Sequence, residues 1–291
     1  MATNGFNTST AAKSIPSEQI DPNIIAAPAI VRAYEGFTWM ADASMGGATY
    51  KFLTLTASSI SGTQTETEAI TASNFGIEDG VATPAVVGDR HFVSDQAVQD
   101  ATIGEDVIFF NLAEKVRNRL NKDICALAAS AATETDKTTE ELTLDNFDAG
   151  YATFLALNPN LARHVLVASS NQIAHIRKAL RTSGNGGLLM GAGLDVFNGR
   201  PNSAYQGNWG SVEIWRGEMP DDGVSDVAGM FVACDEPGGK SGLGLAVWWA
   251  PRPSIEPKPT QVGREFVVDA RYGVCITADH LCHRIVTKKA L

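Results

Sequence analysis

Apolar residues recur at spacings of three and four between positions 102 and 132, the strongest periodic pattern in the chain. This segment holds no proline, and Thr102 followed three residues later by Glu105 forms a capping-box signature. The pattern predicts one long helix, spanning about 40 to 45 Å at a rise of about 1.5 Å per residue. Its apolar positions are Ile103, Val107, Phe110, Ala113, Val116, Leu120, Ile124 and Leu127.

Two segments before this helix have the composition of strands. Residues 49–57 are β-branched and aromatic, and residues 63–73 alternate threonine with glutamine, glutamate and alanine. With Ser61 and Gly62 between them, they predict a long two-stranded hairpin. The second strand is polar at nearly every position, so we expect the hairpin to need a partner surface.

The pattern after the long helix is that of an α/β unit. Residues 143–157 predict a helix, residues 163–169 a buried strand and residues 170–182 a second helix. Residues 183–205 are rich in glycine and asparagine and predict a long loop. Strands are then expected at residues 211–216, 228–234, 243–250, 265–270, 273–278 and 280–287.

Prolines are spaced through two segments, one near each end of the chain. Pro16, Pro22 and Pro28 prevent a long helix in residues 1–45 and favour an extended arm. Prolines at 251, 253, 257 and 259 predict a stiff connector, and residues 271–272 a turn between two strands. The polar N-terminus lacks a signal-peptide pattern, and no run of eighteen apolar residues occurs, so we expect a soluble protein that does not enter a membrane.

Composition narrows the functional classes. The 291 residues are 44% hydrophobic and 19% charged, which is typical of a globular protein with one large domain or two intermediate ones. The formal charge of -10 has the wrong sign for a protein that reads DNA sequence by neutralising phosphates. The four cysteines show neither a disulfide framework nor a CxxC zinc pattern.

The order of these elements resembles the HK97-type capsid fold of tailed-bacteriophage major capsid proteins. Residues 93–97, 163–170 and 266–274 are the most family-like local stretches. The resemblance implies an α+β fold with an N-terminal arm at residues 1–45 and an extended hairpin loop at 46–101. It further implies a spine helix of the peripheral domain at 102–139, an axial α/β domain at 140–255 and returning peripheral strands at 256–291.

The same resemblance implies a structural role with no enzymatic activity. The chain would form pentamers and hexamers of an icosahedral head shell around double-stranded DNA, assembled in the host cytoplasm and carried in the virion. Implied partners are further copies of the chain, a portal protein, a separate scaffolding protein, a decoration protein and DNA bound without sequence preference. An encapsulin-type compartment shell is the alternative, and an ordinary α/β enzyme that uses the glycine-rich loop is a third hypothesis.

Contact candidates between subunits come from the arm, the hairpin, the helix and the loop. They are Ile24, Tyr34, Phe52, Glu66, Glu68, Arg117, Arg119, Gly191 and Gly193. The basic helix residues Lys115, Arg117, Arg119 and Lys122 suit packaged DNA and ion pairs to the acidic hairpin equally well.

No catalytic, cofactor or metal site is predicted. Gly191 and Gly193 lack the strand that a phosphate-binding turn requires. His280 and Cys282 would share one face of a strand with His283 on the other, which favours core packing over zinc. Cys275 near His280 has no activating group, and Trp248 with Trp249 reads as core rather than as a base-stacking platform. In some members of the capsid family that the chain resembles, a lysine of the extended loop is cross-linked to an asparagine of the peripheral domain. Here Lys51 is the only lysine of the hairpin and no asparagine follows Asn208, so we predict no such cross-link between subunits.

Overall fold

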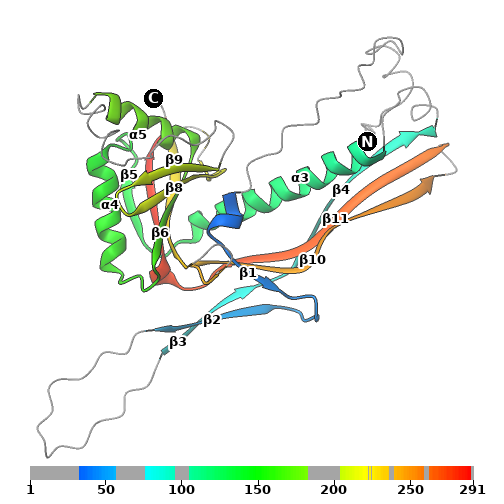
Figure 1. Ribbon diagram of the computed structural model, residues 1–291, viewed down its shortest axis with the longest axis horizontal. Helices are drawn as coiled ribbons and strands as arrows, with labels where there is room; N and C mark the ends of the chain where they lie inside the picture. Colours follow the sequence, from blue (N-terminus) through cyan, green and yellow to red (C-terminus); the bar gives the residue numbers. More distant parts are fainter. Residues whose placement is uncertain are drawn as a thin grey trace, which may run out of the picture.

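The computed structural model describes residues 33–56, 76–95, 105–182, 204–221, 223, 225–235, 239–258 and 262–289. Within them lie a six-stranded sheet, a four-stranded sheet and a two-stranded hairpin. The long helix α3 runs along the four-stranded sheet, with the six-stranded sheet at one end of the helix (Figure 1). Of the contact candidates, Ile24, Glu66, Glu68, Gly191 and Gly193 fall outside the described residues. Tyr34 lies in the 3-10 helix η2 (Ala33–Gly36), and its side chain falls outside the description.

The six-stranded sheet is covered on one face by two helices (Figure 1). Its strand order is β5-β12-β9-β6-β8-β7, and the helices are α4 (Leu144–Ala156) and α5 (Ser170–Thr182). The strands are β5 (Glu134–Lys137), β6 (Arg163–Ala168), β7 (Tyr205–Trp209), β8 (Val212–Arg216), β9 (Asp226–Cys234) and β12 (Cys282–Lys288).

Both faces of this sheet are buried, which explains the continuous apolar run in β6. Leu166 packs with Phe147, Phe154 and Phe231 beneath the helices, whereas Val165 belongs to the core formed with α3. A strand buried on both sides needs apolar residues at every position rather than at alternate ones.

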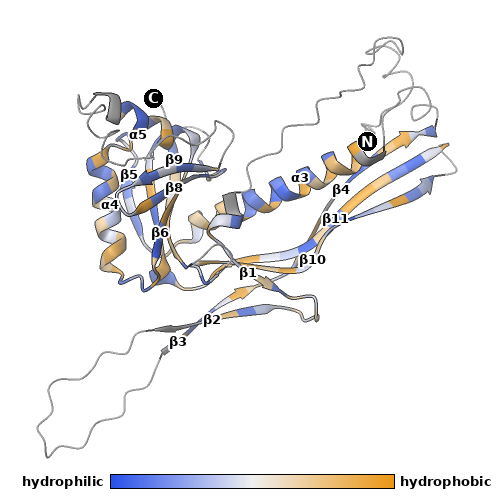
Figure 2. Ribbon diagram, in the orientation of Figure 1, coloured by the Kyte–Doolittle hydropathy of each residue, from blue (hydrophilic) through white to orange (hydrophobic). Residues whose placement is uncertain are grey.

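The four-stranded sheet has the order β1-β10-β11-β4 and lies along α3 (Glu105–Ala126) (Figure 1). Its strands are β1 (Trp39–Asp42), β4 (Ala85–Ser94), β10 (Leu243–Lys258) and β11 (Gly263–Ile276). Leu112, Val116, Phe266, Val268 and Tyr272 form the core between helix and sheet. Polar and apolar residues are interleaved along α3, as expected for a helix with one buried face (Figure 2).

The hairpin consists of β2 (Tyr50–Thr56) and β3 (Gly76–Ala82), which pair antiparallel. The hairpin packs against β10 and β11 on the face of the four-stranded sheet opposite α3. The N-terminal half of β10 and the part of β11 that pairs with it are therefore covered on both faces. Gly244 makes this approach possible, because a Cβ there would lie 2.7 Å from the Phe52 ring.

The predicted α/β unit is confirmed. β6, α4 and α5 lie where the sequence predicts them, and Thr143 caps α4 by accepting a hydrogen bond from the Asn146 N–H at 3.2 Å. The long helix is confirmed, but α3 ends at Ala126, before the predicted residue 132, and the 3-10 helix η3 (Leu127–Ser130) follows it. At 22 residues α3 spans about 33 Å. Thr102 of the capping-box signature lies outside the described residues.

Three predictions about the strands are wrong. β10 continues through Pro251, Pro253 and Pro257, so these prolines belong to a strand and not to a connector. β11 runs through residues 271–272 without a turn, because Arg271 and Tyr272 both pair with residues of β10 on one side and of β4 on the other. β2 pairs with residues 76–82, for which the sequence pattern predicts no strand, and the predicted partner strand at 63–73 lies outside the described residues.

The strand pairing also changes where two segments belong. β10, expected within the axial segment 140–255, pairs with β1 and β11 in the four-stranded sheet. β12, expected among the returning peripheral strands, pairs with β9 and β5 in the six-stranded sheet. His280 lies in the 3-10 helix η5 (Asp279–Leu281) and not on a strand. The five named segments otherwise stay a prediction.

Candidate functional site

The β2–β3 hairpin has one buried face and one exposed face. Phe52 on the inner face is 1% exposed, and its ring lies 5.0 Å from that of Trp39 and 4.9 Å from that of Tyr50, centroid to centroid. Phe52 therefore fills the core of its own chain, which corrects the expectation that it contacts a neighbouring subunit. The large buried ring fixes the hairpin on the sheet.

The outer face of the hairpin carries an exposed apolar strip. Leu53, Ile77 and Val81 are 61%, 65% and 41% exposed, and the register places all three on the face opposite Phe52. Lys51 and Asp79 form an ion pair at 2.8 Å on the same face. We call this set of five residues the outer hairpin face. Large apolar side chains gathered on a protein surface are typical of sites that contact another protein.

A second apolar feature is a groove between β1, α3 and the four-stranded sheet. Its volume is about 560 Å³, and its lining includes Met40, Val116, Leu120, Leu245 and Tyr272. Met40 is 44% exposed at the β1 side. The lining is mostly apolar, so the groove suits an apolar side chain or chain segment better than a charged ligand.

The basic residues of α3 are mostly paired within the chain. Arg117 donates to Glu114 at 2.8 Å, Arg119 pairs with Asp123 at 2.8 Å, and Lys115 pairs with Asp89 of β4 at 2.8 Å. Lys122 is exposed. Three of the four basic side chains that could contact DNA or a neighbouring hairpin are thus paired with acidic residues of their own chain.

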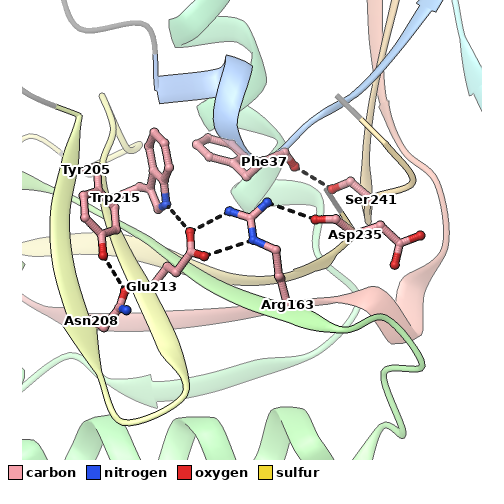
Figure 3. Close-up of polar contacts among 8 residues, drawn as sticks. All are labelled: Phe37, Arg163, Tyr205, Asn208, Glu213, Trp215, Asp235 and Ser241. Atoms are coloured by element: carbon pink, nitrogen blue, oxygen red, sulfur yellow. Dashed lines mark hydrogen bonds and ion pairs between the residues drawn. The ribbon is translucent and has the colours of Figure 1, made fainter. Parts of the chain in front are cut away.

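A polar cluster joins the six-stranded sheet to the segment that leads into β1 (Figure 3). Arg163 on β6 donates two hydrogen bonds to Glu213 on β8, at 3.0 and 2.6 Å, and a third to the carbonyl of Asp235 at 2.9 Å. Trp215 donates its indole N–H to the same Glu213 carboxylate at 3.1 Å. Burial by itself would raise the pKa of Glu213, but the hydrogen bonds from Arg163 and Trp215 hold it below its ordinary value.

Trp215 of this cluster also supports the beginning of the described chain. Its ring packs edge-on against Phe37 at 6.2 Å, and a Cβ at Gly36 would collide with it. Ser241, just before β10, donates its hydroxyl to the Phe37 carbonyl at 2.6 Å (Figure 3). The two sheets and the lead into β1 are therefore held together at one place. No sequence pattern indicates this cluster, since Arg163 and Glu213 lie fifty residues apart with no local motif.

His283 and Cys275, which were considered for zinc binding and nucleophilic chemistry, are both buried. Both ring nitrogens of the buried His283 are within hydrogen-bond distance of hydroxyls, Thr133 at 2.9 Å and Thr135 at 2.8 Å. Burial raises the pKa of Cys275 to about 12, so its thiol is protonated near neutral pH. Among the described residues no three His, Cys, Asp or Glu side chains are grouped to hold a metal ion, and no helix could cross a membrane.

Comparison with solved structures gives end-to-end matches. The capsid of Ralstonia phage GP4 matches with a TM-score of 0.63 at 10% identity, over 100% of this chain and 99% of that chain. The capsid of Helicobacter pylori bacteriophage KHP30 matches with a TM-score of 0.63 at 10% identity, over 99% of both chains. The capsid of cyanophage P-SCSP1u matches with a TM-score of 0.62 at 11% identity, over 93% of this chain and 92% of that chain.

The chain has the fold of bacteriophage capsid proteins. Neither a protein-family model nor a curated protein matches its sequence. The phage capsid fold is thus retained here at an identity where sequence comparison alone finds nothing. The resemblance stated from the order of elements is confirmed at the level of this mixed α+β fold.

Replacing Phe52 by alanine tests whether the inner hairpin face belongs to the core. We expect F52A to lower the free energy of unfolding by about 3 to 5 kcal/mol, because a buried ring is lost and a cavity remains. L53A, one residue along the strand on the outer hairpin face, should change it by no more than about 0.5 kcal/mol. Chemical denaturation of both variants measures the difference, and equal effects would contradict the assignment of the two faces.

The polar cluster predicts a specific dependence of stability on acid. E213Q should lower the free energy of unfolding by about 1 to 3 kcal/mol at pH 7, because Arg163 loses its charged partner. The pKa of Glu213 is lower in the folded chain than its ordinary value of 4.5. Its stabilisation is therefore complete above about pH 4.5 and is lost as the pH falls further.

The matched control for this prediction is E256Q, which removes an exposed carboxylate paired with Lys258. That change should cost about 0.5 kcal/mol or less. Unfolding curves between pH 3 and pH 7 should show wild type and E213Q converging at low pH. A constant gap between the two at every pH would contradict the role given to the Glu213 carboxylate.

Proposed function

We propose that the chain is a structural major capsid protein of a tailed bacteriophage, built on the HK97-like fold. Many copies would assemble as pentamers and hexamers into an icosahedral head shell that encloses double-stranded DNA. The observation that carries this proposal is the match to phage capsid structures over more than nine tenths of both chains. An accessory domain or a shared α/β core would give only a partial match.

The surfaces of the chain support a role in assembly. The outer hairpin face and the groove beside α3 are two apolar surfaces that the described part of the chain leaves open. In a closed symmetric array each subunit meets several neighbours, so weak contacts of this kind sum to a stable particle. The arm candidates Ile24 and Tyr34 and the hairpin candidates Glu66 and Glu68 remain predicted contacts, as do Gly191 and Gly193.

The other partners follow from the same proposal. We expect a portal protein at one vertex, a separate scaffolding protein during assembly in the host cytoplasm, and a decoration protein on the shell. DNA would be held without sequence recognition, which suits a chain of formal charge -10 whose basic helix residues Lys115, Arg117 and Arg119 are ion-paired internally. The encapsulin alternative is not favoured, since the structural matches are to phage capsids.

Electron microscopy of the purified chain, with and without a candidate scaffolding protein, tests the proposal. We expect closed particles of uniform diameter, or capsomers that convert to them. A chain that remains monomeric in light scattering under both conditions would contradict it. Particles that form in a bacterium without phage genes and that hold an enzyme cargo would support the compartment shell instead.

The outer hairpin face predicts a separation between folding and assembly. L53S/I77S should keep the thermal midpoint of the wild type, because both side chains are exposed, yet reduce the yield of particles about tenfold or more. The control is L155S, which removes a leucine that is 43% exposed on α4. Sedimentation measures the particle yield of each variant. An equal loss of particles in the control would contradict a contact role for the outer hairpin face.

A further inference from the structure

The outer side of β10 is covered by another strand along only part of its length. β1 pairs with it in parallel as far as Asp42 opposite Val247, and the Ala43 N–H donates to the Val247 carbonyl at 2.8 Å. Beyond Val247, no strand in the described part of the chain pairs with this side. In the part of the chain that the structure describes, the remainder of β10 is thus an edge strand, and residues 252–257 are all exposed.

The direction of the backbone groups on this edge follows from the register. Asp95 donates its N–H to the Val262 carbonyl at 3.2 Å. The two residues continue the uninterrupted register of β4 against β11, so this bond identifies a hydrogen-bonded pair of that ladder. Hydrogen-bonded and non-bonded pairs alternate along an antiparallel ladder. The even-numbered residues of β11 from 262 to 268 therefore direct their backbone groups toward β4 and away from β10.

Their partners on β10 must then direct their own backbone groups outward. These partners are Pro253 opposite Val268, Ile255 opposite Phe266, and Pro257 opposite Arg264. Two of the three outward positions are prolines, which have no N–H. Ile255 is thus the one outward donor between residues 252 and 258.

Pro251 follows the same logic in a different place. It lies at the irregularity between Trp249 and Arg252, where the register of β10 against β11 shifts. Prolines within sheets are confined to bulges and to edge positions whose N–H would face solvent. All three prolines of the strand occupy positions that leave its pairing with β11 intact.

We infer that the outer edge of β10 from Pro251 to Pro257 is built to refuse strand addition by a second copy of this chain. An incoming strand needs alternating donors and acceptors along the edge, and this edge offers carbonyls with a single N–H. β1 pairs with this edge as far as Val247, and beyond it the prolines remove the N–H donors that another strand would need. Copies of the chain are thereby directed to contact one another through side-chain surfaces. This inference concerns the folded chain and goes beyond the proposed function.

The backbone assignment is tested by adding a proline at each of two neighbouring positions. Ile255→Pro removes only the outward donor, so the thermal midpoint should stay within about a degree or two of the wild type. Ser254→Pro removes an N–H that faces β11 and should lower the midpoint by several degrees. Equal losses in the two variants, measured by thermal unfolding of the full chain, would overturn the assignment.

The refusal of strand addition is tested by restoring the missing donors. P253T/P257T should produce polydisperse, thioflavin-positive aggregates severalfold faster than the wild type at equal concentration. S254T introduces the same residue on the same exposed stretch without adding an outward N–H, and should behave as the wild type. Electron microscopy separates such aggregates from closed particles, so the comparison holds whether or not the wild type assembles a shell. An aggregation rate for P253T/P257T equal to that of S254T would overturn the inference.

Discussion

The antiparallel pairing of β10 with β11 is the contact on which the rest of the structure depends. It runs from Leu243 opposite Ile276 to Lys258 opposite Gly263, and every other part of the four-stranded sheet is attached to it. β1 and β4 extend its two edges, while α3 covers one face and the β2–β3 hairpin part of the other. One hydrophobic cluster joins residues of this pair to α3 and to the six-stranded sheet, so the two sheets share a core.

This two-sided coverage determines where the chain meets other molecules. Phe52 can approach the sheet because Gly244 has no side chain, and Gly80 lies directly against the Ile276 carbonyl for the same reason. With these contacts made, strand alternation requires Leu53 and Ile77 to face away from the core. The burial of Phe52 that holds the hairpin in place thus also determines which apolar residues of the hairpin are exposed.

The elements that sequence patterns predicted well are those whose signals are local. α4 has a threonine cap, and β6 and α5 have boundaries that the apolar pattern marks. The prolines of β10 predict a connector from sequence alone, but a proline interrupts a strand only where its N–H would have paired with a neighbouring strand. Which N–H groups pair depends on the register of β10 against β11, and this register is not visible in the local sequence. Likewise, no local pattern shows that β2 pairs with residues 76–82 across a long intervening segment.

The placement of Phe52 on a contact surface was wrong for a related reason. Phe52 and Leu53 are neighbouring apolar residues, and only the packing of the hairpin shows which of them is buried. Arg117 and Arg119 carry charges that could pair with any acidic group, and in the folded chain they pair with Glu114 and Asp123 on the same helix. Within the described residues, the outer hairpin face and the groove beside α3 offer apolar side chains for association. Such contacts depend on shape, so they discriminate between correct and incorrect neighbours in a way that a bare strand edge does not.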